Sequence, residues 1–347
     1  MDKEKWTEAV TSQYKLHYDD AADPKICVLK FSENLVFRVC IPDEEDRVLR
    51  IHRPGYHTRE ELLAELTWMN ELGHKTQISV PSVFPGRDGS LIQEFEGPDG
   101  RSYCASLISF FHGDLCSSIM GSNPGSPEFA DIIRQIGTIS ASMHRESMTR
   151  NLSPDKAVYP PLVRFSWNEE TMFDDRPNWG HWQDNPHLSG EDSSVLACAE
   201  ATLKEKLRKY GRRDATYGII HADIHLGNVI REGDILHVID FDDMGYGYFL
   251  YDIGCTLLTV PWAAVPALIE AWRRGYEAVR SLTDEEVSLL PWFVLLRKLV
   301  RIAWLASHAD SDTARAVDLS YYADTVRMAR DLIASCPSQT PLPAPSR

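Results

Sequence analysis

One segment near the middle of the chain constrains the fold more than any other. Within residues 217–243, two short apolar runs are separated by a Gly-containing turn. Asp223 follows the first run, Asn228 lies five positions later, and Asp240 follows the second run. Two β-rich runs joined by such a turn predict a hairpin, which brings the polar side chains at its ends close together.

The three side chains predict a particular kind of chemistry. Carboxylate and amide oxygens suit a hard cation such as Mg²⁺. This ion keeps several waters and takes only one or two protein carboxylates together with the phosphates of a substrate. Asp223, Asn228 and Asp240 therefore favour phosphoryl transfer.

The motif in this segment resembles a known family. H-x-D-x-x-x-x-N at 221–228, followed by I-D-F-D at 239–242, is similar to the catalytic and metal loops of the aminoglycoside phosphotransferase and choline kinase-like family, a branch of the protein-kinase-like fold. The nearest branch contains the stress-response kinase, type II homoserine kinase and hydroxylysine kinase. The resemblance implies that Asp223 is catalytic and accepts the proton of the attacking hydroxyl or orients it. It also implies that Asn228 and Asp240 hold Mg²⁺ ions that bridge the phosphates of ATP or GTP.

Further positions of the family pattern occur in the same order along the chain. The resemblance places Ser32 in the loop that covers the phosphates, Arg50 in the third strand and Glu65 in the next helix. Phe110 and His112 resemble the interlobe hinge, which completes the set of nucleotide-binding residues that the family implies. The family often has lysine where this chain has Arg50. A guanidinium remains a permanent cation that can bind phosphate and pair with Glu65.

Roles also follow for the polar residues around the motif. His221 is expected to shape its loop through hydrogen bonds, and Asp252 to brace that loop by accepting backbone hydrogen bonds. His225 and His237 are expected to pack in a loop or a strand. Asp242 is left open between a metal ligand and a hydrogen-bonding partner of the loop.

The first part of the chain predicts a sheet with one helix. Apolar and β-branched runs predict five strands, at 25–31, 35–39, 48–52, 91–95 and 103–110. Thr58 and Glu61 have the spacing of a capping box, and leucines recur at helical period until Gly73, where we expect the helix to end.

The remainder is predicted to be mainly helical. A helix should begin at Ser126-Pro127 and end at His144, and 284–333 should be helical again, whereas 151–192 lacks a clear period. The fold class is therefore α+β, a two-lobed protein-kinase-like fold with an antiparallel sheet and one helix in the N-lobe and a mainly helical C-lobe. The expected divisions are an N-lobe at 1–109, a hinge at 110–113, a C-lobe at 114–335 with an acidic and aromatic insertion at about 151–215, and a Pro/Ser-rich tail at 336–347.

Composition limits the partners. With 36 Lys and Arg against 51 Asp and Glu, the net charge is −15, which disfavours binding to nucleic acid. The seven cysteines form no C-x-x-C pair and are expected to be reduced and mostly buried. The N-terminus lacks an apolar signal core and no apolar stretch is long enough to span a bilayer, so we expect a cytoplasmic protein that does not bind membranes.

The expected activity is Mg²⁺-dependent transfer of the γ-phosphoryl group of ATP or GTP to a hydroxyl of a small molecule. A cationic acceptor would fit the segment in which Trp167, Trp179 and Trp182 lie among many acids, and a solvated acidic face explains that segment equally well. Three alternatives remain open at this point. They are a protein Ser/Thr kinase of the stress-response type, a metal-dependent hydrolase centred on His221, Asp223, His225 and Asp240, and a non-catalytic nucleotide-binding relative.

Overall fold

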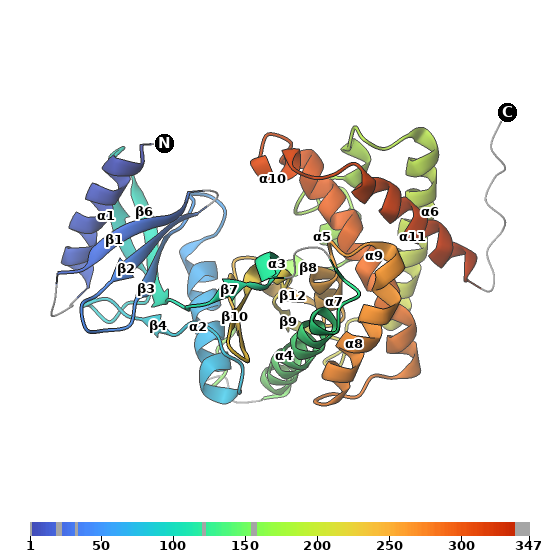
Figure 1. The fold of residues 1–347 in the computed structure, drawn as a ribbon, viewed down its shortest axis with the longest axis horizontal. Helices are drawn as coiled ribbons and strands as arrows, with labels where there is room; N and C mark the ends of the chain where they lie inside the picture. Colours follow the sequence, from blue (N-terminus) through green and yellow to red (C-terminus); the bar gives the residue numbers. More distant parts are fainter. Residues whose placement is uncertain (1, 19–22, 32–33, 120–122, 154–157, 337–347) are drawn as a thin grey trace. The chain divides into compact units, whose positions relative to one another are not determined.

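The structure, a computed structural model, describes residues 2–18, 23–31, 34–119, 123–153 and 158–336 (Figure 1). The chain divides into two compact units. The first comprises 1–119, 153–164 and 226–244, and the second comprises 120–152, 165–225 and 245–347. The segment 226–244, which carries Asn228 and Asp240, therefore clusters with the N-terminal unit.

The first unit is built on an antiparallel sheet with the strand order β1-β2-β3-β6-β4, in which β5 also pairs with β6. Its strands are β1 (Lys25–Phe31), β2 (Leu35–Cys40), β3 (Arg47–Ile51), β4 (Val83–Phe84), β5 (Gln93–Glu96) and β6 (Ser102–Ser109). The predicted antiparallel N-terminal sheet is thus confirmed. The short strand β4 was not predicted, because a pair of strand residues carries no measurable period.

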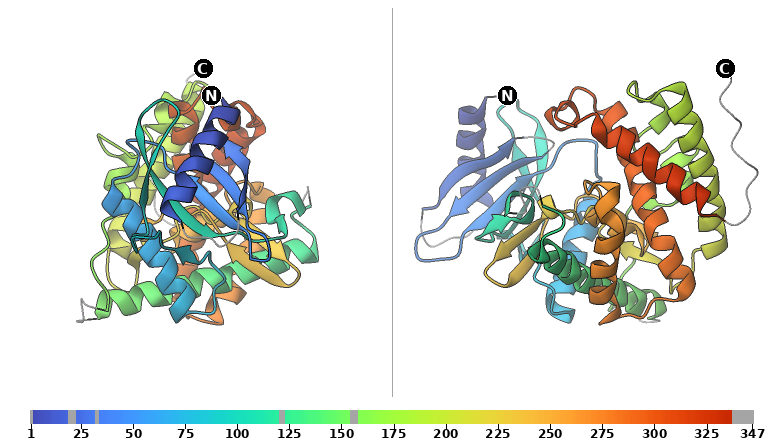
Figure 2. Two further views of the ribbon diagram at one scale, coloured as in Figure 1. Left: turned by 90° about the vertical axis from the view of Figure 1, so that its left-hand side faces the viewer. Right: turned by 45° about the vertical axis from the view of Figure 1, so that its right-hand side comes forward.

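Successive side chains of β3 point to opposite faces of the sheet, so that one face carries apolar residues and the other carries Arg50. Leu49 and Ile51 point into an apolar core with strand residues such as Phe37, and α1 (Lys3–His17) covers this core through residues such as Trp6. Figure 2 shows α1 lying across the strands. Arg50, between Leu49 and Ile51, must face the opposite side of the sheet.

Helix α2 (Arg59–Lys75) begins as predicted. The Thr58 hydroxyl accepts from the Glu61 N–H, and the Glu61 carboxylate accepts from the Thr58 N–H, which completes a capping box. The prediction that Gly73 ends the helix is wrong. Gly73 adopts helical conformation, and α2 continues for two more residues before Thr76 becomes extended. A single glycine weakens a helix but does not stop it when neighbouring turns are packed.

A second, smaller sheet completes the first unit. It has the order β11-β10-β7, with β7 (Asp114–Leu115), β10 (Val229–Glu232) and β11 (Ile235–Val238), flanked by α3 (Cys116–Ile119) and the 3-10 turn η2 (Leu226–Asn228). The predicted hairpin is confirmed only in part. The first apolar run, Tyr217–Ile220, is not in it and pairs with Gly245–Tyr248 in the second unit. The hairpin forms between β10 and β11, where Glu232 pairs with Ile235 across a two-residue loop. Gly233 in that loop has φ of 59°, a left-handed conformation that glycine adopts at low cost.

The second unit is mainly helical, as predicted. Its helices and short strands are α4 (Pro127–Leu152), β8 (Ser166–Trp167), α5 (Glu169–Phe173), η1 (Trp182–Asp184), α6 (Gly190–Tyr210), β9 (Tyr217–Ile220), β12 (Gly245–Tyr248), α7 (Tyr251–Thr256), η3 (Trp262–Ala264), α8 (Val265–Glu277), α9 (Asp284–Ser307), α10 (Asp312–Arg315) and α11 (Ser320–Ala334). The three strands form a sheet of order β8-β12-β9.

Two boundaries in this unit differ from the predictions. Helix α4 does not end at His144 but continues to Leu152, because Ser147 and Arg150 are also buried and extend its packed face. The region 284–333 is helical as predicted, but it is divided into α9, α10 and α11 by short non-helical connections at 308–311 and 316–319. Helices α4 and α8 approach closely at Gly275, where an added Cβ would lie 1.7 Å from the Arg134 carbonyl oxygen.

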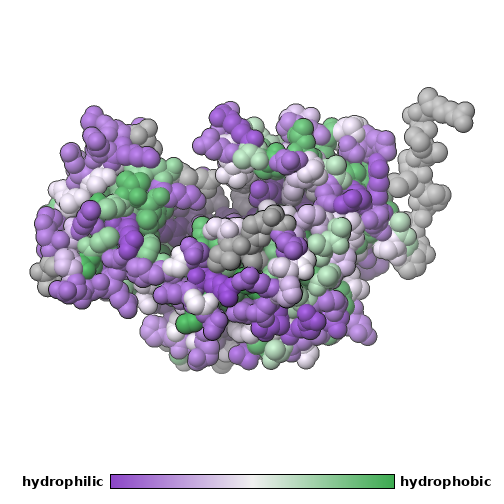
Figure 3. Space-filling model, in the orientation of Figure 1, coloured by the Kyte–Doolittle hydropathy of each residue, from purple (hydrophilic) through white to green (hydrophobic). Residues whose placement is uncertain are grey.

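Hydrophilic residues cover most of the face seen in Figure 3, as expected for a chain with a net charge of −15. None of the seven cysteines forms a disulfide, but only Cys116 and Cys255 are buried, so the expectation of mostly buried thiols is wrong. Within the described residues, no helix is both long and apolar enough to cross a membrane.

Candidate active site

A buried ion pair in the first unit lies at the centre of the candidate nucleotide site. Arg50 on β3 and Glu65 on α2 are 6% and 1% exposed, and Nη1 of Arg50 donates to Oε1 of Glu65 at 2.7 Å. A buried charge requires a partner of opposite sign, and each of these residues supplies it for the other. The pairing predicted from the sequence is confirmed.

The same guanidinium contacts two acids that follow strand β11. Nη2 of Arg50 lies 3.2 Å from Oδ1 of Asp242 and 3.5 Å from Oδ1 of Asp240. Burial alone lowers the pKa of Arg50, but the carboxylates of Glu65, Asp240 and Asp242 outweigh burial and raise it above its usual value. Arg50 is therefore a permanent cation fixed between the sheet, α2 and the loop after β11.

Asn228 and Asp240 lie at adjacent ends of the hairpin. The Ile239 N–H donates to the Asn228 carbonyl at 3.0 Å, which ties the two loop ends together. Asn228 is 7% exposed, whereas the Asp240 side chain is 44% exposed. Asp240 has φ of 64°, an uncommon conformation for a non-glycine residue that is typical of functional sites. An accessible carboxylate beside an amide is a donor set that fits Mg²⁺.

Both the side chain and the main chain of Asp242 make contacts within the first unit, the side chain with Arg50. The carbonyl of Asp242 accepts hydrogen bonds from Nε2 of His57, at 2.9 Å, and from Nη2 of Arg164. Burial raises the pKa of its carboxyl, opposed by the charge of Arg50 and assisted by that of Asp240. These contacts show Asp242 as a hydrogen-bonding partner of the loop, while a role as a metal ligand remains a prediction.

The other residues predicted to bind nucleotide lie in different parts of the same unit. Phe110 and His112 follow β6 and their rings pack edge to face, with centroids 5.1 Å apart. The guanidinium of Arg38 lies 4.4 Å from the centre of the Phe110 ring, and the Phe110 N–H donates to the Asp46 carbonyl. Ser32 lies outside the described residues.

In the second unit, Asp223 is bound by a buried arginine of α9. Nη2 of Arg297 donates to Oδ1 of Asp223 at 2.8 Å, and Nε2 of His225 lies 3.4 Å from Oδ2. Burial raises the pKa of Asp223, but His225 and Arg297 outweigh it and hold the pKa well below its usual range. Asp223 is therefore an ionised carboxylate at neutral pH, which favours orientation of a hydroxyl by hydrogen bonding over strong basicity.

The backbone just before Asp223 is strained and firmly held. Ala222 has φ of 65°, which costs a residue with a Cβ about 1–2 kcal/mol. The Asp252 carboxylate accepts from the N–H groups of His221, at 3.2 Å, and Ala222, at 2.9 Å. The thiol of Cys255 donates to the Ala222 carbonyl. The prediction that Asp252 braces this loop is confirmed.

The histidines near the motif have separate partners. Nδ1 of His221 accepts from the Asp223 N–H at 3.3 Å, as expected for a residue that shapes the loop. His225 does more than pack in the loop, because it contacts the Asp223 carboxylate. His237 stacks on Phe111 with centroids 4.0 Å apart and bonds to Ser79, which matches its predicted packing role.

Replacing Asp252 with asparagine should lower the free energy of unfolding by about 3 kcal/mol, because a buried, multiply bonded carboxylate is lost from between His144 and the loop. Urea denaturation measures this change. Asp310→Asn, at a fully exposed position, is the matched control and should leave stability unchanged. Equal stability of both variants would show that Asp252 does not hold the loop.

Stability should also depend on the protonation of His144. This residue is fully buried and bonds through its two ring nitrogens to Tyr276 and Asp252. Burial lowers its pKa below the usual value, although Asp252 acts in the opposite direction. The unfolded chain therefore takes up a proton near pH 6.5 that the folded chain does not.

We accordingly expect the contribution of His144 to stability to be constant above pH 7 and to fall below about pH 6.5, by at most about 1.4 kcal/mol per pH unit. Unfolding by urea at pH 7.5, 6.5 and 5.5 measures the slope. His144→Gln should be less stable overall but should show a shallower slope. Equal slopes in the two proteins would exclude His144 as a source of the pH dependence.

Two arginines of the site were not predicted. Arg297 binds Asp223, and Arg164 donates to the carbonyls of Asp242 and Met244. For Arg297 a signal was present, because Arg297 and Lys298 interrupt an otherwise apolar helix. A buried cation within an apolar stripe requires a carboxylate partner elsewhere in the chain.

The acidic and aromatic segment is largely occupied with structural contacts. Glu169 and Glu170 both lie 3.0 Å from Nη2 of Arg212, and Asp174 lies 3.2 Å from the Lys204 amine. Trp182 is buried and donates to Glu200. Much of the negative charge that favoured a cationic acceptor is thus already neutralised within the second unit.

The four residues considered for a hydrolase centre are all described by the structure. Across the described part of the chain, no group of three or more His, Cys, Asp or Glu side chains is placed to hold a metal ion. His225 contacts Asp223, and His221 hydrogen-bonds with the Asp223 backbone.

The antiparallel sheet, the helical second unit and these charge networks are features of the kinase-like phosphotransferase class. The chain belongs to the phosphotransferase enzyme family, APH, whose pattern matches residues 30–290. Amicoumacin kinase of Bacillus subtilis is 23% identical over 316 residues, covering 88% of this chain and 87% of the relative. Homoserine kinase of Sinorhizobium fredii is 30% identical over 229 residues, covering 62% and 58%.

Solved structures agree with this assignment. The microcompartment-associated aminopropanol kinase superposes with a TM-score of 0.79 and 30% identity, covering 94% of this chain and 97% of that one. An amicoumacin kinase in complex with AMP-PNP, Ca²⁺ and Ami superposes with a TM-score of 0.69 and 19% identity, covering 95% and 94%. The protein is accordingly an enzyme, a small-molecule phosphotransferase with the protein-kinase-like fold predicted from its sequence.

Proposed function

We propose that this enzyme transfers the γ-phosphoryl group of ATP, or GTP, to a hydroxyl of a small molecule in a Mg²⁺-dependent reaction. The observation that carries the proposal is the buried Arg50–Glu65 pair with Asp240 and Asp242 beside it. A fixed cation next to an accessible carboxylate provides what a metal-bound triphosphate requires. Kinase relatives named for amicoumacin, homoserine and aminopropanol support a hydroxyl-bearing acceptor.

In this proposal each residue of the site has a defined task. Arg50 contacts the nucleotide phosphates, Glu65 orients Arg50, and Asn228 and Asp240 are the metal ligands. When bound, Mg²⁺ neutralises the negative charge of the phosphates. Ser32 belongs to the loop that covers the phosphates, and Phe110 and His112 belong to the segment that holds the base.

Asp223 acts on the acceptor. Its ionised carboxylate accepts a hydrogen bond from the acceptor hydroxyl and directs the oxygen for attack on the γ-phosphorus. Arg297 and His225 keep the carboxylate ionised, and Asp252 keeps its loop in place. A loose transition state depends on such positioning and on charge neutralisation more than on covalent participation of the protein.

A panel of hydroxylated amines, amino acids, sugars and aminoglycosides, incubated with ATP and Mg²⁺, tests the proposal. We expect release of ADP that depends on one class of acceptor and formation of a phosphate monoester. Stoichiometric zinc in the purified protein, without nucleotide binding, would instead support a metal-dependent hydrolase. Binding of nucleotide with no turnover on any acceptor would support a non-catalytic relative.

A further inference from the structure

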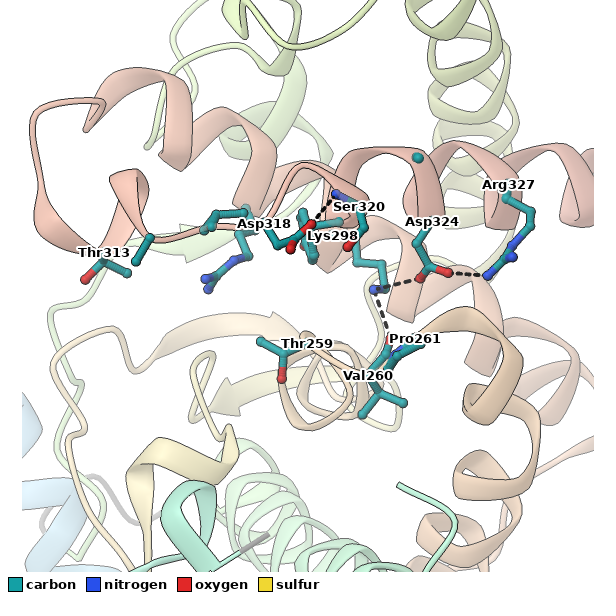
Figure 4. Close-up of a pocket in the computed structure, with 14 residues that line it drawn as sticks. Thr259, Val260, Pro261, Lys298, Thr313, Asp318, Ser320, Asp324 and Arg327 are labelled. Carbon is teal, nitrogen blue, oxygen red and sulfur yellow. Dashed lines mark hydrogen bonds and ion pairs between the residues drawn. The ribbon is translucent and has the colours of Figure 1, made fainter. Parts of the chain in front are cut away.

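A pocket of about 970 Å³ lies within the second unit (Figure 4). Helices α9, α10 and α11 and the segment 259–261 after α7 provide its lining. In Figure 4 the side chains of α11 line one wall and Thr259, Val260 and Pro261 the opposite wall.

The pocket has a positive lining in an otherwise acidic protein. Lys298, Arg301 and Arg327 line it, against Asp318 and Asp324, so that 3 − 2 leaves one positive charge in a chain of net charge −15. Both acids are also already engaged. Asp318 accepts from the Ser320 N–H at 2.7 Å, and Asp324 accepts from the Trp262 N–H at 2.8 Å and from Arg327.

Two buried polar atoms of the described pocket residues lack a hydrogen-bond partner. Among the described residues, the hydroxyl of Tyr321 and Nε of Arg301 are buried and have no hydrogen-bond partner. Buried polar atoms are rarely left unpaired, so each of these two atoms requires a partner from outside the chain, such as a water, an ion or a bound molecule. Both donors require an acceptor, which an anion supplies.

Lys298 adds a third donor. Its amine donates to the Val260 carbonyl at 3.1 Å and lies 3.8 Å from Asp324, and its side chain is 1% exposed. Burial lowers the pKa of Lys298 to about 8, so the amine is still mostly protonated at pH 7. The amine lies 4.9 Å from the centre of the Tyr321 ring, and the Arg301 guanidinium lies 5.7 Å from it, so the three groups form one cluster.

Two residues of this cluster, Lys298 and Arg301, lie on α9, the helix whose Arg297 binds the proposed catalytic carboxylate. Arg297, which binds Asp223 at 2.8 Å, directly precedes Lys298 on α9. The charge of Arg297 also acts on the Tyr321 hydroxyl, which places the two side chains within electrostatic reach. Helix α9 therefore contributes both the residue that binds Asp223 and two residues that line the pocket.

We propose that this pocket binds the phosphate acceptor and that Arg301, Lys298 and Tyr321 hold a carboxylate group of that molecule. The acceptor is then a small hydroxylated carboxylic acid or amino acid and not an amino alcohol. This inference rests on the proposed function, because it assigns the acceptor of the same reaction. It replaces the cationic acceptor considered from the sequence with one that is recognised through an anionic group.

Three matched pairs of compounds test the proposal, since each pair differs only by a carboxylate. They are serine and ethanolamine, threonine and 1-amino-2-propanol, and homoserine and 3-amino-1-propanol. We expect kcat/KM for at least one acid to exceed that of its partner by about 10- to 100-fold, the value of hydrogen bonds to a charged group. Arg301→Gln should abolish this preference through KM and leave the KM for ATP unchanged.

Control variants separate recognition from structural damage. Tyr321→Phe should weaken the preference less than Arg301→Gln does. Arg330 lies on α11, as Tyr321 does, but it pairs with Glu191 outside the pocket. Arg330→Gln should therefore behave as wild type. An equal or greater rate with the amino alcohols would overturn the proposal, and so would an acid preference that survives both pocket variants. Preference for glycerol 3-phosphate over the acids would overturn the assignment of a carboxylate.

Calorimetric binding measurements test the pocket independently of the proposed phosphotransferase activity. If none of the six compounds is phosphorylated, their binding to the ATP-free protein still tests the pocket. Binding of an acid, but not of its decarboxylated partner, that is lost in Arg301→Gln supports the pocket even though the proposed activity fails. Absence of binding by all six compounds would overturn it. Phosphorylation of amino alcohols alone would overturn the pocket and leave the phosphotransferase function intact.

Discussion

Replacement of Asp223 with asparagine should lower kcat by about a hundred- to ten-thousandfold, the usual contribution of a positioned acid or base. The amide keeps an oxygen that can accept from Arg297, so the fold should survive, but it loses the charge that attracts the proton of the acceptor hydroxyl. The dissociation constant for ATP should be unchanged, because the described contacts of Asp223 involve Arg297 and His225 and not the Arg50 network.

Steady-state kinetics and calorimetric titration with ATP measure these two quantities separately. Asp214→Asn, an exposed acid before β9, is the control and should match wild type in both. Turnover by Asp223→Asn within tenfold of wild type would exclude Asp223 as the group that acts on the acceptor. A loss of ATP binding equal to the loss of rate would assign Asp223 to the nucleotide instead.

Replacement of Asp240 with asparagine should have the opposite pattern. Metal ions contribute several kcal/mol to charge stabilisation, and each 1.4 kcal/mol is a factor of ten, so affinity for ATP in the presence of Mg²⁺ should fall by about 100-fold or more. Arg50 keeps Glu65 and Asp242 as partners, so the variant should remain folded. Affinity for ATP in the presence of EDTA should not fall, because removal of a carboxylate reduces repulsion of the phosphates.

Calorimetric titrations with and without Mg²⁺ test this expectation. Asp234→Asn, an exposed acid in the turn of the same hairpin, is the matched control and should bind as wild type. Should Asp240→Asn bind Mg²⁺ and ATP as tightly as wild type, Asp240 would not be a metal ligand. A parallel loss in EDTA would assign its effect to Arg50 rather than to the metal.

The sheet was predictable from local pattern. Strands β1, β2 and β3 match the predicted ranges within one residue at each end, because apolar residues alternate along them and polar turns separate them. Helix α1 was not predicted, although Trp6, Val10 and Tyr14 lie on one face at helical spacing. Mostly polar residues fill the positions between them, and the apolar stripe is recognisable only once the sheet beneath it is known.

The candidate site was likewise predictable from the sequence only in part. The partnership of Arg50 and Glu65 and the bracing role of Asp252 followed from resemblance to a family pattern, and the contacts bear them out. Arg297 could not be assigned to Asp223, because 74 positions separate them and no local signal fixes such a pairing. The left-handed backbone of Ala222 was equally unpredictable, since alanine carries no preference for that conformation.

The most direct test of the account is phosphorus NMR of the protein with ATP, Mg²⁺ and an acceptor that supports ADP release. The account predicts that the γ-phosphate signal is replaced by a phosphate monoester in an amount equal to the ADP formed, and that this signal is nearly absent with Asp223→Asn. Inorganic phosphate as the sole product, or equal monoester formation by wild type and Asp223→Asn, would contradict it.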